Sequence, residues 1–139
     1  MGGVAASDER RLQRSSDAAS ILLSEMLGVD VVDIERLRAM LERSPSLEAR
    51  LFTEEERSYC SSMSDPVVHM AGTLAAKEAA MKTLGLGGLH AWARRIEVSR
   101  DAEGVPSVRV EDHEGGPPIA VSISHDAGIA VAVALRLPG

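Results

Sequence analysis

The stretch from Ile119 to Leu137 alternates strongly between large apolar and small residues, and the segment 125–128 (His-Asp-Ala-Gly) divides it into two halves. Such alternation is typical of β-strands, and a short connection containing glycine is typical of a hairpin. We predict a three-residue loop with Gly128 in the left-handed region. The cross-strand pairs that follow from this loop are Ile123 with Val131, Val121 with Val133, and Ile119 with Leu135.

This register places the large residues of both strands on one face of the hairpin, with His125 at the mouth of that face. Because side chains alternate between the faces of a strand, the opposite face would carry only small residues, and a helix could lie very close to it. The predicted small residues are Ala120, Ser122, Ser124, Ala130, Ala132 and Ala134.

The first regular segment is a short β-rich run, which we predict to be a strand at 26–32. Asp33 follows it in the position of a helix N-cap. Apolar residues then recur at helical spacing until Ser44-Pro45, and a further turn of helix is expected at 46–51.

Two more helices are expected before residue 85. Thr53 and Glu56 have the form of a capping box, in which each side chain satisfies a free backbone N–H near the other residue, so a helix should run to about Ser62. Pro66 can open a longer, Ala-rich helix that reaches Leu84, with Gly85 as the left-handed residue at its end.

The order of the elements favours one fold class. Strands are expected at 96–99 and 105–110 around a hairpin loop, so that a strand and three main helices are followed by four strands. Such an order predicts an α+β domain, with helices packed on a mostly antiparallel sheet. The Gly-Leu-Gly-Gly segment 85–88 follows a helix rather than opening one, so it is not a nucleotide-binding loop.

Length and composition exclude several classes of function. The 139 residues suffice for one domain, which we place at 26–139 after a flexible N-terminal extension at 1–25. A net charge of −6 provides no basic field for nucleic acid or an anionic membrane, and one Phe, one Tyr and one Trp make base-stacking platforms improbable. The lone Cys60 and the lack of a secretion signal or apolar span favour the cytoplasm.

Two acids stand out as candidates for chemistry. Asp30 lies inside an apolar strand, where a carboxylate needs either a partner or a solvent-facing position. Glu78 lies in the long helix, where an ion pair with Lys82 four residues later is the alternative to a functional role. Neither residue decides between these alternatives alone.

Four segments taken together carry a resemblance. They are Gly28-Val29-Asp30-Val31-Val32-Asp33-Ile34-Glu35-Arg36, Leu51-Phe52-Thr53-Glu54-Glu55-Glu56, Ala75-Ala76-Lys77-Glu78-Ala79-Ala80-Met81-Lys82, and Ser122-Ile123-Ser124-His125. In this order and at these spacings the chain resembles the small holo-acyl-carrier-protein synthases, which are single-domain 4'-phosphopantetheinyl transferases. The resemblance covers residues 26–136.

The resemblance implies an α+β trimer with active sites at the subunit interfaces. It implies coenzyme A as the donor, a serine hydroxyl of an apo acyl carrier protein as the acceptor, and 3',5'-adenosine bisphosphate as the leaving group. Asp30 and Glu78 match the family's metal ligands, and Mg²⁺ is commonly held by one or two carboxylates together with substrate phosphates. Glu78, or a water held by the metal, would accept the serine proton.

The resemblance also implies a set of donor-binding residues: Lys77, Lys82, Gly85, Gly87 and His125, of which Lys82 is assigned a catalytic role as well. A flexible ammonium near phosphates acts as a point charge. Each residue has a structural alternative as well: ordinary helix lysines, a helix C-cap for Gly85, and a strand-end imidazole bonded to a backbone carbonyl for His125. The family docks its acidic carrier on arginines at positions matched by Arg36, Arg43 and Arg50.

The chain departs from the family pattern at three places. Thr73 stands where the family usually has an arginine and Leu74 where it usually has a phenylalanine, so a phosphate contact and an aromatic contact are in question. The segment 111–118 is short, whereas many members carry a helix there. The first 25 residues precede the usual start of the family.

Two other functions remain open from the sequence. One is a non-catalytic subunit of the same fold that binds a carrier protein. The other is a Mg²⁺-dependent hydrolase acting on a nucleotide pyrophosphate, in which the same acids position water instead of serine.

Overall fold

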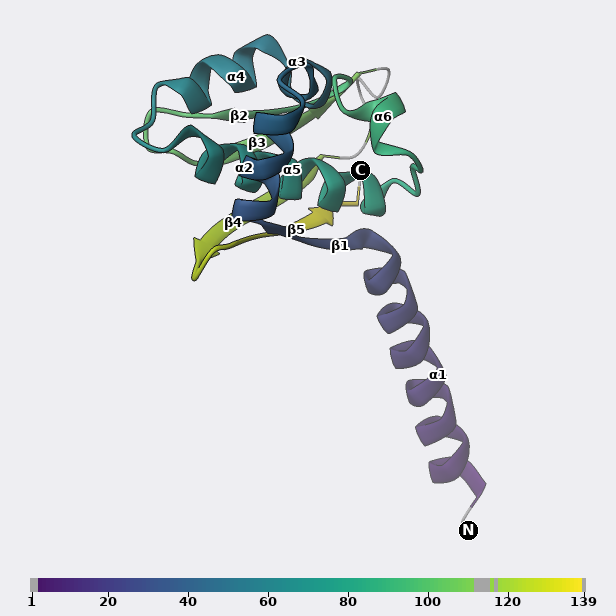
Figure 1. The fold of residues 1–139 in the computed structure, drawn as a ribbon. Helices are drawn as coiled ribbons and strands as arrows, with labels where there is room; N and C mark the ends of the chain where they lie inside the picture. The colour runs from purple at the N-terminus through teal and green to yellow at the C-terminus, as the bar shows by residue number, and fades with distance from the viewer. Residues whose placement is uncertain (1–2, 112–115, 117, 139) are drawn as a thin grey trace.

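A computed structural model describes residues 3–111, 116 and 118–138, with side chains described for all of these except 3, 4 and 21–25. After α1, one strand is followed by a run of helices and then by the remaining strands, which is the predicted order apart from α1 and α6 (Figure 1). The elements are α1 (Gly3–Met26), β1 (Leu27–Asp33), α2 (Ile34–Arg43), α3 (Ser46–Leu51), α4 (Glu54–Ser61), α5 (Pro66–Thr83), α6 (Leu89–Trp92), β2 (Ile96–Arg100), β3 (Pro106–Val110), β4 (Ile119–Asp126) and β5 (Ile129–Arg136).

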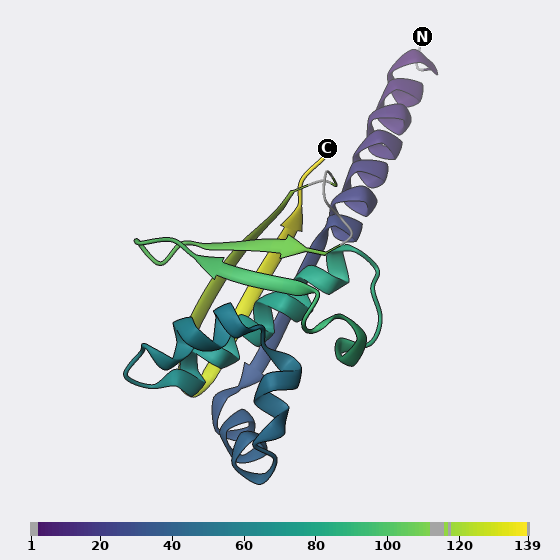
Figure 2. The ribbon, with the colours of Figure 1, turned by 90° about the horizontal axis from the view of Figure 1, so that it is seen from above.

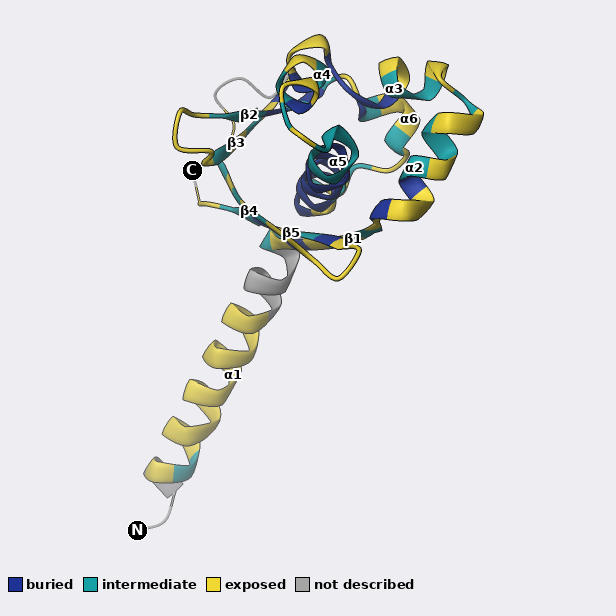
Figure 3. Cartoon of the chain, turned by 60° about the vertical axis from the view of Figure 1, so that its left-hand side comes forward, coloured by how far each residue is buried: buried dark blue, intermediate teal, exposed yellow. Residues whose placement is uncertain are grey.

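The strands form two antiparallel sheets. One has the order β1-β5-β4, and the other is the hairpin β2-β3. Helix α5 lies between them, with the three-stranded sheet on one side, β2 and β3 on the other, and α2, α3 and α4 around its remaining side (Figures 1 and 3). This arrangement confirms the predicted α+β class with helices packed on antiparallel strands.

Small residues allow α5 to lie very close to the three-stranded sheet. Ala75, Ala76, Ala79 and Ala80 are fully buried and form one cluster with alanines of β5. A Cβ atom at Gly28 of β1 would come within 2.0 Å of the carbonyl oxygen of Ala79. Glycine is therefore required at residue 28, and the close approach places β1 directly beside the second half of α5.

The helix boundaries agree closely with the sequence patterns. Asp33 caps α2 by accepting a hydrogen bond from the Arg36 N–H at 2.9 Å, and Thr53 and Glu56 form the predicted capping box of α4. Gly85 follows α5 with φ +65°, as expected of a left-handed terminal residue. The first strand ends one residue later than predicted, and the short helix α6 within the Gly-rich connection was not predicted.

The predicted register of the last hairpin is wrong by one residue. The structure pairs Ile123 with Ala132 and Asp126 with Ile129, which leaves a two-residue turn at Ala127 and Gly128. Both turn residues have positive φ, the conformation of the tight turns that match the twist of paired strands.

The corrected register changes which residues share a face. Ile119, Val121 and Ile123 of β4 face α5 together with the alanines of β5. The opposite face of the sheet carries cross-strand pairs of large apolar residues from β1 and β5, which are Leu27 with Leu135, Val29 with Val133, and Val31 with Val131. The outer face is therefore apolar along β1 and β5, whereas the large residues of β4, predicted to share a face with those of β5, turn toward α5.

Helix α1 projects away from the rest of the molecule and touches it only near β1 (Figures 1 and 2). Its described side chains are almost all exposed (Figure 3). Flexibility of residues 1–25 and the domain boundary after them stay predictions. Among the described helices, none combines the length and the apolar character needed to cross a membrane.

Candidate active site

The structure brings the two predicted acids together. Asp30 lies on the face of β1 that is turned toward α5, and its side chain is 14% exposed. Glu78 lies on the facing side of α5, close enough for its carboxyl group to interact directly with that of Asp30. The alternative in which Asp30 points into solvent is therefore wrong.

Lys82 joins this pair from the next turn of α5. Its ammonium donates to the carbonyl oxygen of Val29 at 2.7 Å and lies 3.4 Å from Asp30 Oδ1. The Lys82 side chain thus turns toward β1 and forms its ion pair with Asp30, where the sequence alternative had paired it with Glu78. More than half of this side chain remains exposed, so the ammonium is also open to a ligand.

The carboxyl groups of Asp30 and Glu78 have too few hydrogen-bond donors around them. Asp30 Oδ2 is buried and has no hydrogen-bond donor among the described residues. Burial, together with the neighbouring carboxyl of Asp30, raises the pKa of Glu78 from its ordinary value of 4.5 to about 7. Two close carboxylates with an unsatisfied buried oxygen need either a shared proton or a cation.

These residues fit a divalent cation of the oxygen-preferring kind. No cluster of three or more His, Cys, Asp or Glu suited to a metal occurs among the described residues. A cation here would therefore have two protein carboxylates and would complete its shell with water and substrate oxygens, which is the usual manner of Mg²⁺.

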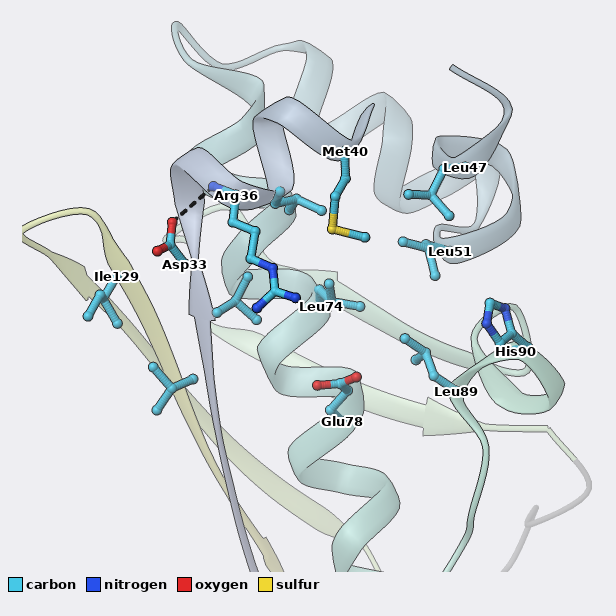
Figure 4. A pocket seen from close by; sticks show the side chains of 13 residues that line it. Asp33, Arg36, Met40, Leu47, Leu51, Leu74, Glu78, Leu89, His90 and Ile129 are labelled. Carbon is cyan, nitrogen blue, oxygen red and sulfur yellow. Dashed lines mark hydrogen bonds between the residues drawn. The ribbon is translucent and has the colours of Figure 1, made fainter. Parts of the chain in front are cut away.

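Glu78 also lines a cavity of about 520 Å³ between α2, α5, α6 and the edge of β1. Most of the lining is apolar, and the polar exceptions are few. Figure 4 shows the Arg36 side chain extending from α2 toward Leu74 and Glu78, with Asp33 and His90 at the margins. A mostly apolar cavity with a few convergent polar groups is the usual form of a small-molecule site.

Lys77, predicted to bind the donor, does not line this cavity. Its side chain is 0% exposed, and its ammonium contacts Glu56 Oε1 at 2.5 Å and the carbonyl oxygen of Leu51 at 2.9 Å. The ammonium also lies 5.6 Å from the centre of the Phe52 ring. This placement makes Lys77 a structural residue that joins α5 to the start of α4.

Glu56 is the centre of the same buried network. Its carboxylate accepts hydrogen bonds from the backbone N–H groups of Thr53 and Val98, each at 2.8 Å, in addition to the Lys77 contact. It thereby links α4, α5 and β2. The capping role predicted for Thr53 and Glu56 is confirmed, and burial and the Lys77 contact add to it.

The glycines after α5 are exposed. Nothing lies within 4 Å of a Cβ atom placed on Gly85 or Gly87. The positive φ of Gly85 explains that glycine by backbone conformation, whereas Gly87 has no such constraint. Donor binding by either residue stays a prediction.

His125 lies at the exposed end of β4, and the structure adds a neighbour that sequence reasoning missed. The ring of His69, from the first turns of α5, lies 6.1 Å from the His125 ring, centre to centre. Nothing in the sequence indicates that the start of α5, which carries His69, meets the end of β4.

The three arginines predicted to dock the carrier have exposed side chains on α2 and α3. Arg36 borders the cavity, Arg43 ends α2, and Arg50 lies 3.5 Å from the Ser46 hydroxyl. Arg38, by contrast, pairs with Asp65 at 2.9 Å and with Glu35, so it joins α2 to the start of α5. The departure at 111–118 lies mostly outside the described residues.

Comparison with known proteins places the chain in a family. The model of the 4'-phosphopantetheinyl transferase superfamily matches residues 26–134. The chain is 40% identical over 116 residues to a holo-[acyl-carrier-protein] synthase of Moorella thermoacetica, covering 78% of this chain and 90% of that protein. It is 43% identical over 113 residues to the corresponding protein of Clavibacter sepedonicus, covering 76% and 89%.

Solved structures of holo-acyl-carrier-protein synthases share the fold. The protein of Neisseria meningitidis has a TM-score of 0.72 at 25% identity, covering 82% of this chain and 98% of that one. The protein of Bacillus anthracis, solved in complex with CoA (3',5'-ADP), has a TM-score of 0.67 at 31% identity, covering 78% and 92%. These matches confirm the resemblance predicted from the four motifs: the chain belongs to the 4'-phosphopantetheinyl transferase superfamily.

Proposed function

We propose that this protein transfers the 4'-phosphopantetheine group from coenzyme A to a serine of an apo acyl carrier protein. The reaction would be Mg²⁺-dependent and would release 3',5'-adenosine bisphosphate. The proposal rests on the pair Asp30 and Glu78. Glu78 lines the cavity, and Asp30 Oδ2 is buried without a hydrogen-bond donor among the described residues. Relatives named as holo-acyl-carrier-protein synthases support the same reaction.

Asp30 and Glu78 would hold the Mg²⁺ ion. When bound, Mg²⁺ supplies positive charge that neutralises the pyrophosphate of the donor. The protein contributes by fixing the two carboxylates on rigid elements, because β1 and α5 are held together at Gly28 and Ala79. Such fixed charges need no reorganisation when the phosphoryl group is transferred.

Glu78 is suited to accept the proton of the attacking serine hydroxyl. In the metal-free protein its pKa is raised to about 7, and because bound Mg²⁺ would lower that pKa, a water held by the metal is the alternative proton acceptor. The Glu78 side chain also borders the cavity, so a hydroxyl that enters from the side of α2 can reach the carboxylate.

Lys82 would stabilise negative charge on the donor and its leaving group. Its ammonium is placed by the Val29 carbonyl and by Asp30, and its exposed side chain leaves further N–H donors for phosphate oxygens. Backbone groups near Gly85 and Gly87 would contact the donor on the same end of α5. Lys77 is left out of this proposal because it is fully buried.

We further propose a homotrimer with active sites at the subunit interfaces. Exposed apolar residues form a stripe on the outer face of the three-stranded sheet: Leu27, Val29, Val31, Ile129 and Val133. Contiguous apolar patches on a soluble protein commonly mark an interaction surface. Val31 and Ile129 line the cavity as well, so a subunit on this face would lie at the rim of the site.

The acceptor would approach from the side of α2. Carrier proteins of this kind are acidic, and Arg36, Arg43 and Arg50 offer exposed guanidinium groups on α2 and α3. Arg36 would then lie between the carrier and the cavity. A cytoplasmic location stays a prediction, as does the class of carrier, whether from fatty-acid, polyketide or peptide synthesis.

Intact mass spectrometry tests the proposal directly. Purified protein, Mg²⁺ and coenzyme A are incubated with a panel of apo carriers from fatty-acid, polyketide and peptide synthases. We expect at least one carrier to gain the mass of one phosphopantetheine arm, and Asp30→Ala and Glu78→Ala to lose most of the rate. Glu103→Ala, an acid in the exposed β2-β3 loop, is the matched control and should keep the wild-type rate.

The same assay separates the alternatives. A folded protein that binds a carrier without any mass gain across the panel would favour the non-catalytic subunit. Release of 3',5'-adenosine bisphosphate without a carrier would favour the hydrolase.

A further inference from the structure

Three side chains that can carry positive charge meet at the end of the molecule where α5 begins. His69 comes from α5, His125 from the end of β4, and Arg100 from the end of β2. The two imidazole rings lie 6.1 Å apart, centre to centre, with an edge-to-face orientation. Burial lowers the pKa of His69, and the positive charges of Arg100 and His125 lower it further.

Arg100 is held in place by its neighbours. Its guanidinium lies over the Tyr59 ring at 4.8 Å from the ring centre, and Nη1 donates to the Thr73 hydroxyl at 3.3 Å. Nη2 lies 3.8 Å from the position that a Cβ atom on Gly72 would occupy, so the guanidinium lies against the backbone of α5. A stacked, half-buried guanidinium is preorganised for a planar, multidentate ligand.

Among the described residues, no carboxylate forms an ion pair with Arg100. None of the ion pairs between described residues includes it, and the Thr73 contact is its one hydrogen bond there. Asp65, the acid that acts on His69, is bound at both oxygens by Arg38. Asp101, the next residue along the chain, accepts hydrogen bonds from the backbone N–H groups of Glu103 and Val105.

The position of Arg100 matters because of its partner. In this family the position of Thr73 is usually an arginine. Arg100 reaches the same point of α5 from the end of β2. A guanidinium and two imidazoles together favour a compact anion with two negative charges.

We propose that Arg100, together with His69 and His125, binds the phosphate monoester of coenzyme A and so supplies from β2 the guanidinium absent at Thr73. This inference rests on the proposed function. The monoester is assigned because the pyrophosphate belongs with Asp30 and Glu78. Residues 73 and 78 of α5 point about 140° apart around the helix at 100° per residue, so the two groups occupy different sides of it.

Donor discrimination tests this assignment. Arg100→Met keeps the apolar stem but removes the charge and the donors. With coenzyme A we expect its KM to rise about tenfold or more at nearly unchanged kcat, since a hydrogen bond to a charged group is lost. With 3'-dephospho-coenzyme A, which lacks the monoester, wild type and variant should have similar KM values.

Matched variants separate binding from packing and net charge. Arg109→Met removes the same charge from the neighbouring strand β3 and should leave the preference for coenzyme A over its dephospho form intact. The double variant Thr73→Arg with Arg100→Thr should recover most of that preference. A KM that rises equally for both donors, or for neither, would overturn the assignment.

A binding measurement keeps the result independent of turnover. Isothermal titration with 3',5'-adenosine bisphosphate and with adenosine 5'-monophosphate, both with Mg²⁺, should show that wild type prefers the bisphosphate and that Arg100→Met and Arg100→Lys lose most of this preference. If wild type shows the preference but no carrier gains mass, the proposed reaction fails and the phosphate site stands. If carriers gain mass and the preference survives in both Arg100 variants, the phosphate site fails and the reaction stands.

Discussion

At the scale of single residues, Glu78 is a carboxyl group in surroundings that favour its protonated form. Its pKa is raised from 4.5 to about 7, mainly by burial and also by Asp30. A raised pKa of an acid means that ionisation opposes folding. The unfavourable contribution is absent below about pH 4.5, grows as the pH rises from there, and is complete above about pH 7.

Glu78→Gln should therefore stabilise the metal-free protein at pH 8. We expect its free energy of unfolding to exceed that of wild type by about 1 to 3 kcal/mol at pH 8, with a smaller difference at pH 5. Urea denaturation in the presence of EDTA at both pH values measures this.

Added Mg²⁺ should then stabilise wild type at pH 8 but not Glu78→Gln, because the variant lacks one of the two carboxylates. Glu103→Gln, in an exposed loop, is the control and should behave as wild type. If Glu78→Gln instead lowered the free energy of unfolding by the same amount at both pH values, ionisation of Glu78 would not oppose folding, and the prediction would be wrong.

The identities of Asp30 and Glu78 could be predicted from the sequence, because an acid inside an apolar strand and an acid in a recognisable motif both attract attention. The placement of Lys77 could not. Nearly every residue of α5 from Met70 to Met81 is buried, so the apolar pattern does not show which way a given side chain points. Arg100 was missed because its partners come from three other elements.

At the scale of elements, the approach of β1 to α5 sets the geometry of the two acids. Gly28 lies two residues before Asp30, and Ala79 directly follows Glu78. A Cβ atom at residue 28 would lie 2.0 Å from the Ala79 carbonyl oxygen, so the strand and the helix would have to separate. Overpacking of this kind commonly costs about 1 to 3 kcal/mol.

Gly28→Ala should lower both the free energy of unfolding and the affinity for Mg²⁺. The loss of affinity follows because separation of β1 from α5 moves the two carboxylates apart. Urea denaturation and isothermal titration with Mg²⁺ measure the two effects. Gly87→Ala is the control for stability, since nothing lies within 4 Å of its Cβ position, and it should change the free energy of unfolding by less than about 0.5 kcal/mol. Unchanged stability in Gly28→Ala would contradict the close approach.

The last hairpin shows where sequence patterns fail at this scale. Alternation correctly predicted two paired strands, but the register depended on the conformation of one residue. Ala127 adopts φ +50°, which alanine rarely does, so a turn with only Gly128 left-handed was the natural expectation. A shift of one residue then turned Ile119, Val121 and Ile123 of β4 toward α5, away from the face that carries the large residues of β5.

At the scale of the whole molecule, that outer face is the strongest indication of assembly. Val29 and Val31 of β1 are 54% and 57% exposed, and Val133 of β5 is 43% exposed. Because these valines belong to one face of one sheet, a second subunit could cover them together. We expect light scattering to give the mass of a trimer.

Val29→Lys should convert this trimer to monomers and reduce the transferase rate. A lysine on the outer face of an edge strand is well tolerated in a monomer, but its buried charge would oppose association. Val105→Lys is the matched control, since Val105 is 58% exposed in the β2-β3 loop, away from this face. Val105→Lys should remain a trimer with wild-type activity. A wild-type protein that is monomeric at assay concentration, or a Val29→Lys variant that is fully trimeric, would contradict both the assembly and the interface site.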